Sequence, residues 1–269
     1  MKVVARVKSR GAYTAAVDIE AERKELVRRI RLHGKRAGDP WLKKYAGSPL
    51  PVLGLRTGVH RQILRDFHRG HGDLAIRDVH RLAASLWERA KYFEERTAAI
   101  ELLLRYHRRL FDASWRLADS WVDQATGWAL SDGLAMGPLA RLAFREPARF
   151  QEILWWGKSK NPWRRRASVY ALRDFVRAGQ LEPAFQLLSR LLYDEEFWVQ
   201  RAVGTWLREC WKKDPPRTEA FLRAHSKGLP RVTITVATER APKAFREELR
   251  RRAGPRGPPG KHSPGAHQD

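Results

Sequence analysis

The sequence WALSD at residues 128–132 begins with a tryptophan, and aromatic residues recur at intervals of 35 positions on both sides of it. The recurrent aromatics are Phe93, Trp128, Trp163 and Trp198. Neighbouring columns agree as well: three positions further on stand Arg96, Ser131, Arg166 and Arg201, and four positions further on stand Thr97, Asp132, Ala167 and Ala202. A period of this length, filled with helix-forming residues, is typical of stacked helical pairs. We therefore predict an all-α, HEAT-like helical-repeat solenoid.

Composition and charge narrow the range of partners. The 269 residues carry 53 Lys and Arg against 30 Asp and Glu, a net charge of +23. Such a surplus attracts polyanions, of which nucleic acid is the commonest. A membrane is the competing partner for basic helices, but no apolar run approaches the ~18 residues of a spanning segment. The apolar part of residues 1–6 is too short for a signal peptide. The single cysteine, Cys210, suits a reducing cytosol and is expected to be a half-buried helix residue.

The chain divides into three parts. Residues 1–13 are basic and aperiodic, which predicts a loose N-terminal arm. Residues 14–252 alternate amphipathic helical segments with breaks such as Gly54, Asn161-Pro162 and Gly228-Leu229-Pro230. Residues 253–269 are rich in Pro and Gly and predict a disordered tail. The β-branched run at residues 232–236 has no neighbouring strand with which to pair, so we expect a helix or an extended connection there.

Each recurrent position of the 35-residue repeat allows two interpretations. An aromatic residue at the same point of every repeat usually wedges between repeats, and an arginine one turn later is often only solvated. However, Arg96, Arg166 and Arg201 recur in register, so they could form a row of phosphate-binding cations along a concave surface. Asp132 lies four residues after Trp128 and would share its helix face, as a candidate base or electrostatic stabiliser. It could equally cap a helix that begins at Gly133.

Four segments, in order, resemble the DNA alkylation repair (AlkD-type) family of HEAT-like DNA glycosylases. Residues 128–132 resemble its Trp-x-x-x-Asp segment, and Asn161 to Ala167 (NPWRRRA) are similar to its next-repeat motif ending in a functional arginine. Residues 194–204 with 207–209 resemble its C-terminal signature, and Tyr45 with the turn at residues 53–56 resembles its N-terminal entry. The resemblance spans residues 40–240.

The resemblance implies a role for each matched residue. Asp132 would be the catalytic carboxylate, Trp128 an aromatic wall against the sugar of the lesion, Arg166 a phosphate clamp, and Tyr45 a contact to the nucleic acid. Where the family has a second site tryptophan this chain has Thr205, and Trp206 follows one step later as the candidate second lesion contact. One step along a helix turns a side chain by about 100°.

The implied substrate explains why so few residues would be needed. An N-alkylated purine such as 3-methyladenine or 7-methylguanine is a cation, and its charge already weakens the bond to deoxyribose. A carboxylate can then stabilise the positive charge that develops on the sugar and orient a water. Aromatic faces attract the cationic base. The resemblance therefore implies a DNA glycosylase that acts on double-stranded DNA with no cofactor and no metal, and we expect a cytoplasmic, nucleoid-associated monomer.

Other candidate residues rank lower. The histidines His60, His68, His71 and His80 lack the spacing of a zinc site and are expected to face a duplex or solvent. Glu94 and Glu95 are expected to form a solvated helix start, and Asp119 and Asp123 are the reserve carboxylates if Asp132 is only a cap. The alternative function is a non-catalytic basic module that binds distorted DNA or structured RNA. A protein-interaction scaffold is a third possibility.

Overall fold

The computed structural model describes residues 17–254 and residue 261, so the predicted arm at residues 1–13 lies outside the described part. Helices make up the regular elements of the described residues, as predicted. Their bounds are α1 (Ile19–Leu32), α2 (Pro40–Ala46), α3 (Thr57–Gly70), α4 (Ile76–Glu88), α5 (Phe93–Arg105), η1 (His107–Arg109), α6 (Asp112–Val122), α7 (Trp128–Leu134), η2 (Ala135–Leu139), α8 (Ala140–Arg145), α9 (Arg149–Trp156), α10 (Pro162–Tyr170), α11 (Arg173–Arg177), α12 (Glu182–Leu191), α13 (Phe197–Trp211), α14 (Pro215–Ala224), α15 (Arg231–Ala237) and α16 (Lys243–Arg252).

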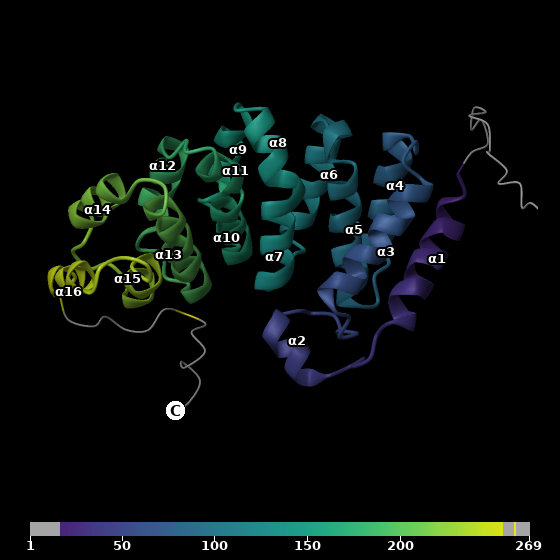
Figure 1. Cartoon of the computed structure of the whole chain (residues 1–269), viewed down its shortest axis with the longest axis horizontal. Helices are drawn as coiled ribbons and strands as arrows, with labels where there is room; N and C mark the ends of the chain where they lie inside the picture. The colour runs from purple at the N-terminus through teal and green to yellow at the C-terminus, as the bar shows by residue number, and fades with distance from the viewer. Residues whose placement is uncertain (1–16, 255–260, 262–269) are drawn as a thin grey trace, which may run out of the picture.

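The 35-residue period corresponds to one row of helices. Helices α5 and α7 begin at the recurrent aromatics Phe93 and Trp128, while α10 and α13 begin one residue before Trp163 and Trp198. Each of these helices packs against the next, and α13 packs in turn against α15 (Figure 1). The rings of Trp163 and Trp198 lie 6.4 Å apart between α10 and α13, as expected of aromatics that wedge between repeats.

A second row of helices is joined by stacked aromatic rings. Trp87 of α4 stacks on Trp121 of α6, with ring centroids 4.7 Å apart, and Trp115 of α6 stacks on Trp156 of α9 at 5.3 Å. The tryptophans Trp87, Trp115 and Trp121 are all at most 1% exposed. Burial of such large rings between successive repeats supplies much of the apolar contact that holds a solenoid together.

Helix α2 stands apart from both rows and lies below them in Figure 1, near the start of α7. Asp39 caps its N-terminus, Pro40 occupies its first turn, and Gly47 ends it in the left-handed conformation. Gly127 precedes α7 with φ +82°, and a Cβ atom there would lie 1.9 Å from the carbonyl oxygen of Gly47. Only glycine fits this close approach, which ties α2 to the N-terminus of α7.

The path from α7 to α8 contains a kink. The π-helical turn η2 includes Pro138, and Gly137 has non-helical angles of φ −83° and ψ −112°. Proline lacks a backbone donor and forces such a break. Helix α8 therefore does not continue α7 as one regular helix, although the two follow each other in the chain.

The structure tests two further expectations from the sequence, on residues 232–236 and on Cys210. Residues 232–236 lie within the helix α15, which confirms the helical alternative. Cys210 was expected to be half-buried, but it is 0% exposed, and burial raises the pKa of its thiol to about 12. Most of the predicted disordered tail, residues 255–260 and 262–269, lies outside the described part, and Lys261 forms a parallel β-bridge with Glu196. Within residues 17–254, no helix is both long and apolar enough to span a bilayer.

Candidate active site

A cleft of about 790 Å³ opens between helices that lie far apart in the sequence. Tyr45 comes from α2, His60 from α3, Thr97 from α5, and Trp128 and Asp132 from α7. Asp132 lies inside α7, one residue before Gly133, and therefore does not cap a helix beginning at Gly133. Trp128 and Asp132 share the helix face that lines the cleft, as their spacing of four predicted.

Tyr45 and Trp128 line the cleft, and together with Trp41, which stacks on Tyr45 outside the lining, they form its aromatic mouth. Trp41 and Tyr45 of α2 stack with centroids 5.2 Å apart, and Tyr45 meets Trp128 edge-on at 5.4 Å. Trp41 and Tyr45 are 60% and 58% exposed, whereas Trp128 is half-buried. The indole Nε1 of Trp128 donates a hydrogen bond to the carbonyl oxygen of Tyr45 at 2.5 Å, which fixes its ring relative to α2. The exposed partner Trp41 was not among the residues expected at the site.

Asp132 is 6% exposed and is bound by one arginine. Arg166 of α10 donates from Nε to Oδ1 and from Nη2 to Oδ2, both at 2.7 Å. Burial raises the pKa of the Asp132 carboxyl above its ordinary value, and the bonds from Arg166 oppose that rise. The bidentate geometry is that of an ionised pair, and Asp132 in turn helps to raise the pKa of Arg166.

The tyrosine one turn beyond Arg166 belongs to the same group of side chains. The hydroxyl of Tyr170 accepts a hydrogen bond from Nη2 of Arg166 at 3.0 Å. Burial and the nearby Asp132 carboxylate raise the pKa of Tyr170 to about 12, so the phenol is neutral at physiological pH. Its ring also meets Trp206 of α13 edge-on at 5.9 Å.

The three recurrent arginines do not form one exposed row. Arg166 is 3% exposed, so the expectation of an exposed row is wrong for this residue. Arg96 lies over the ring of Trp87 at 4.8 Å and donates to the carbonyl oxygen of Gln124 at 3.1 Å. Arg201 is exposed on α13. The three arginines recur because each stands at the same position of its helix. Their surroundings differ because each contacts different residues.

A second cavity of about 450 Å³ adjoins the first at Met136 and Arg173, which line both. Thr205 and Trp206 lie on its wall. Trp206 is only 4% exposed, and its Nε1 has no hydrogen-bond partner among the described residues. Basic side chains line both cavities, and the 35-residue period did not identify these residues. They are Arg36, Arg56, Arg61, Arg173, Arg177, Arg208, Lys212 and Lys213.

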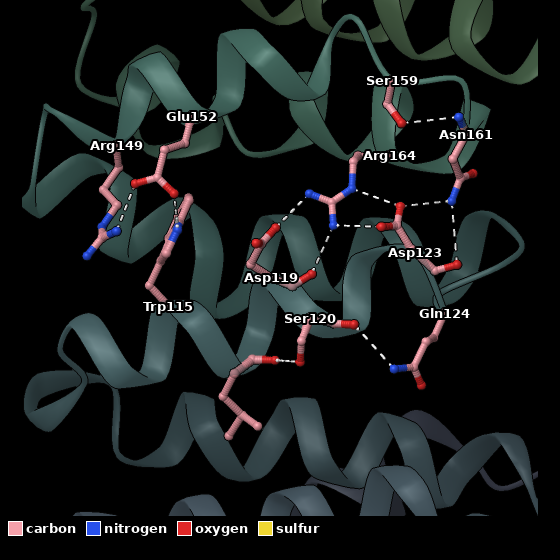
Figure 2. A network of polar contacts seen from close by, with 11 residues as sticks. Trp115, Asp119, Ser120, Asp123, Gln124, Arg149, Glu152, Ser159, Asn161 and Arg164 are labelled. Atoms are coloured by element: carbon pink, nitrogen blue, oxygen red, sulfur yellow. Dashed lines mark hydrogen bonds and ion pairs between the residues drawn. The ribbon is translucent and has the colours of Figure 1, made fainter.

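The reserve carboxylates are engaged elsewhere. Arg164 of α10 donates to Asp119 at 2.7 Å and to both oxygens of Asp123, at 2.8 and 3.0 Å (Figure 2). This pairing holds α6 against α10, and Asn161 extends it by donating to Asp123 at 3.1 Å. Arg165, the next residue, binds Asp194 through two bonds of 2.6 and 3.0 Å. The run Arg164-Arg165-Arg166 thus binds four different carboxylates, those of Asp119, Asp123, Asp194 and Asp132.

Glu94 and Glu95 differ from their expected solvated state. They are 5% and 1% exposed. Glu94 accepts hydrogen bonds from three successive backbone amides, of residues 53–55, at 2.9, 2.9 and 3.3 Å. Glu95 binds Arg31 of α1 at 2.7 Å. Both carboxylates therefore fasten the N-terminal elements to α5.

Three of the histidines that were expected to face a duplex or solvent have partners within the protein, and His60 lines the cleft. His60 is 8% exposed and contacts the carbonyl oxygen of Glu94 at 3.1 Å, and burial lowers its pKa. His71 contacts Glu22 at 3.1 Å, and His80 contacts the hydroxyl of Ser114 at 2.7 Å. Across residues 17–254, no group of three His, Cys, Asp or Glu side chains could hold a metal ion.

Comparisons with known proteins identify the family and the fold of the chain. The family profile described as "DNA alkylation repair enzyme" matches residues 27–241 of the 269. The chain belongs to the DNA alkylation repair enzyme family. No curated protein matches the chain.

Two solved structures have the same fold as this member of the DNA alkylation repair enzyme family. One is a predicted DNA alkylation repair enzyme from Enterococcus faecalis, 14% identical, with a TM-score of 0.67, covering 78% of this chain and 99% of its own. The other is AlkD2 from Streptococcus mutans, 15% identical, with a TM-score of 0.61, covering 83% and 99%. They confirm the HEAT-like architecture. The family match, residues 27–241, includes every residue that lines the cleft and the adjoining cavity.

Proposed function

We propose that the protein is a DNA glycosylase that removes N-alkylated, cationic purines, of the 3-methyladenine and 7-methylguanine type, from duplex DNA. The observation that carries the proposal is an arginine-paired carboxylate, Asp132, on the wall of an open cleft that has an aromatic mouth. The family match supplies the class of reaction, DNA alkylation repair. Asp132, Trp128 and Tyr45 are the residues to which we assign the chemistry.

Asp132 has two tasks in this reaction. As the bond between the base and C1′ breaks, positive charge develops on the sugar, and a carboxylate in a largely water-excluded wall stabilises that charge strongly. The same carboxylate can accept a proton from the attacking water. The leaving purine takes the bonding electrons and becomes neutral, so it requires no acid. The reaction consumes one water and uses no cofactor.

The aromatic mouth favours a cationic base over a neutral one. An alkylated purine placed against Trp128 gains a cation–π attraction of roughly 0.5–2 kcal/mol. Trp41 and Tyr45 offer a second, exposed aromatic surface at the same edge. The cations of the two adjoining cavities provide phosphate contacts for the strands on either side, and we propose that a monomer suffices for this interface.

The test compares base release from three duplexes that contain 7-methylguanine, uracil or only normal bases. We expect release from the first duplex alone. Asp132→Asn is expected to lower that release by about 10²–10⁴-fold, the usual contribution of a positioned acid–base group. Asp123→Asn is the matched control, since it also removes an arginine-paired carboxylate but lies outside the cleft. Release that is equal in the parent and in Asp132→Asn would refute the proposal.

Thr205 supports a second candidate function. It stands where the family resemblance calls for a site tryptophan, and Trp206 next to it is buried against Tyr170. A cleft with one aromatic wall fewer could recognise distorted DNA or structured RNA without turnover. Tight binding of the 7-methylguanine duplex with no release, and equally tight binding of the undamaged duplex, would favour this alternative.

A further inference from the structure

The guanidinium of Arg166 is nearly saturated with protein partners. Its Nε and Nη2 donate to the two oxygens of Asp132, Nη1 donates to the carbonyl oxygen of Trp198 at 2.5 Å, and Nη2 also donates to Tyr170. A guanidinium has five N–H donors, so these bonds leave one unassigned. A phosphate that needs a bidentate grip would have to break bonds that already exist.

The position of Arg166 also separates it from the nucleic acid. Asp132 lines the cleft, but Arg166 lines neither that cleft nor the adjoining cavity, and it is 3% exposed. It therefore lies behind the carboxylate, on the protein side. The rings of Tyr170 and Trp198 lie 4.7 and 5.9 Å from its guanidinium carbon and close it off further.

We infer that Arg166 is a positioning residue: it keeps the Asp132 carboxylate ionised and aimed into the cleft, and it does not bind phosphate. A carboxylate this deeply buried takes up a proton unless a cation or hydrogen-bond donors stabilise its charge. Arg166 binds both oxygens from α10, while Asp132 itself lines the cleft. Tyr170, one turn further along α10, accepts a hydrogen bond from the guanidinium and so helps to fix its position.

The other charged groups near Asp132 are accounted for. On the cleft side, α3 contributes His60 and Arg61, α5 contributes Glu94 and Glu101, and α11 contributes Arg173. Arg36 and Arg56 come from the segments that precede α2 and α3. Glu101 is paired with Arg105, and Arg173 is paired with Asp174. Arg166 is the cation that contacts the carboxylate directly.

The inference rests on the proposed function for its role in catalysis, but its test needs no turnover. Two quantities are measured in Arg166→Met: the pKa of Asp132, by carbon-13 NMR of the labelled carboxyl, and the slope of log affinity for an undamaged duplex against log salt concentration. We expect the pKa to rise relative to the parent and the slope to stay the same. A phosphate clamp would instead lower the slope by about 0.9 for the lost contact. Arg61→Met, which removes a cleft-lining cation, is the positive control for the slope.

A lower slope in Arg166→Met, or an Asp132 titration that does not move, would overturn the inference. If Arg166→Met fails to fold, Tyr170→Phe and Arg166→Lys take its place. The first removes one hydrogen bond to the guanidinium and the second replaces the planar fork with a point charge, so each should raise the pKa of Asp132 less than Arg166→Met would. Absence of base release by the parent would refute the proposed function and leave these two measurements intact.

Discussion

At the scale of single residues, Asp132 and Arg166 behave as one unit. A pair this well buried gains little stability over a well-packed apolar pair, because desolvation offsets most of the attraction. Removing one partner is different, since it leaves an uncompensated charge in the interior. We therefore interpret the role of the pair as follows: Arg166 keeps the carboxylate of Asp132 ionised in the wall of the cleft, where burial alone would favour the protonated acid.

Arg166→Met should destabilise the fold by about 3–5 kcal/mol at neutral pH, because Asp132 then remains buried without its cation. The penalty should shrink as the pH falls through the raised pKa of Asp132, since the protonated carboxyl carries no charge to compensate. Urea unfolding across pH measures both effects. The double variant Asp132→Asn/Arg166→Met should be more stable than Arg166→Met alone, and a double variant that is no more stable would contradict this interpretation.

Trp128→Ala should slow release of 7-methylguanine by a factor equivalent to roughly 0.5–2 kcal/mol, since the cationic base loses its aromatic wall. Single-turnover rates measure this effect. Trp155→Ala is the matched control, because Trp155 is 68% exposed on α9 and does not line the cleft. An equal loss in both variants would indicate a general effect on the fold rather than a contact to the base.

At the scale of elements, the cleft depends on the placement of α2. This helix carries Trp41 and Tyr45, and it is joined to the row of α7 through the close approach of Gly47 and Gly127. The contact between these two glycines and the hydrogen bond from Trp128 to Tyr45 therefore hold the aromatic mouth together.

Gly127→Ala should release α2 from α7, because the added methyl group would lie 1.9 Å from a carbonyl oxygen. We expect faster amide exchange in residues 40–46 than in the parent, with exchange in α13 unchanged, as hydrogen exchange can measure. Gly179→Ala is the control: Gly179 also has positive φ, at +78°, but a Cβ there meets nothing within 4 Å. Both variants incur left-handed strain, so only the clash distinguishes them. An α2 that exchanges at the parent rate in Gly127→Ala would contradict this role.

The sequence predicted the elements better than the environments of charged residues. The 35-residue spacing predicted stacked helices, and the recurrent aromatics prove to lie within one residue of the starts of α5, α7, α10 and α13, because helical repeats return to the same geometry. The burial of Glu94 and of Arg166 was missed, since each looks like part of an ordinary solvated charge run. Their partners, the amides of residues 53–55 and Asp132, lie 34 to 41 positions away, and no local pattern identifies them.

At the scale of the whole molecule, a net charge of +23 surrounds a core of buried aromatic and ionisable groups. The charge implies that affinity for any nucleic acid will fall steeply with salt, whether or not the protein is an enzyme. Salt dependence alone therefore cannot distinguish the two candidate functions. The buried ionisable groups, in contrast, determine how the stability of the fold depends on pH.

Stability should fall as the pH rises from about 9 to about 12. Burial raises the pKa of Tyr106 and Tyr170 from 10.0 to about 12, and that of Cys210 from 9.0 to about 12. Between the ordinary and the raised pKa the folded state binds more protons than the unfolded state, so each pH step favours unfolding. Urea unfolding at pH 8 and pH 11 measures the loss. Tyr106→Phe should lose less than the parent over this interval, and an equal loss would exclude Tyr106 as a contributor.

The most direct test of the central claim, that a charged Asp132 drives base release, is the single-turnover rate of 7-methylguanine release by Asp132→Asn at saturating enzyme. Asparagine keeps the shape of the side chain and removes its charge, so the rate of the folded, duplex-bound variant should fall by about 10²–10⁴-fold. A parental rate in Asp132→Asn, with the variant folded and bound to the duplex, would contradict the claim.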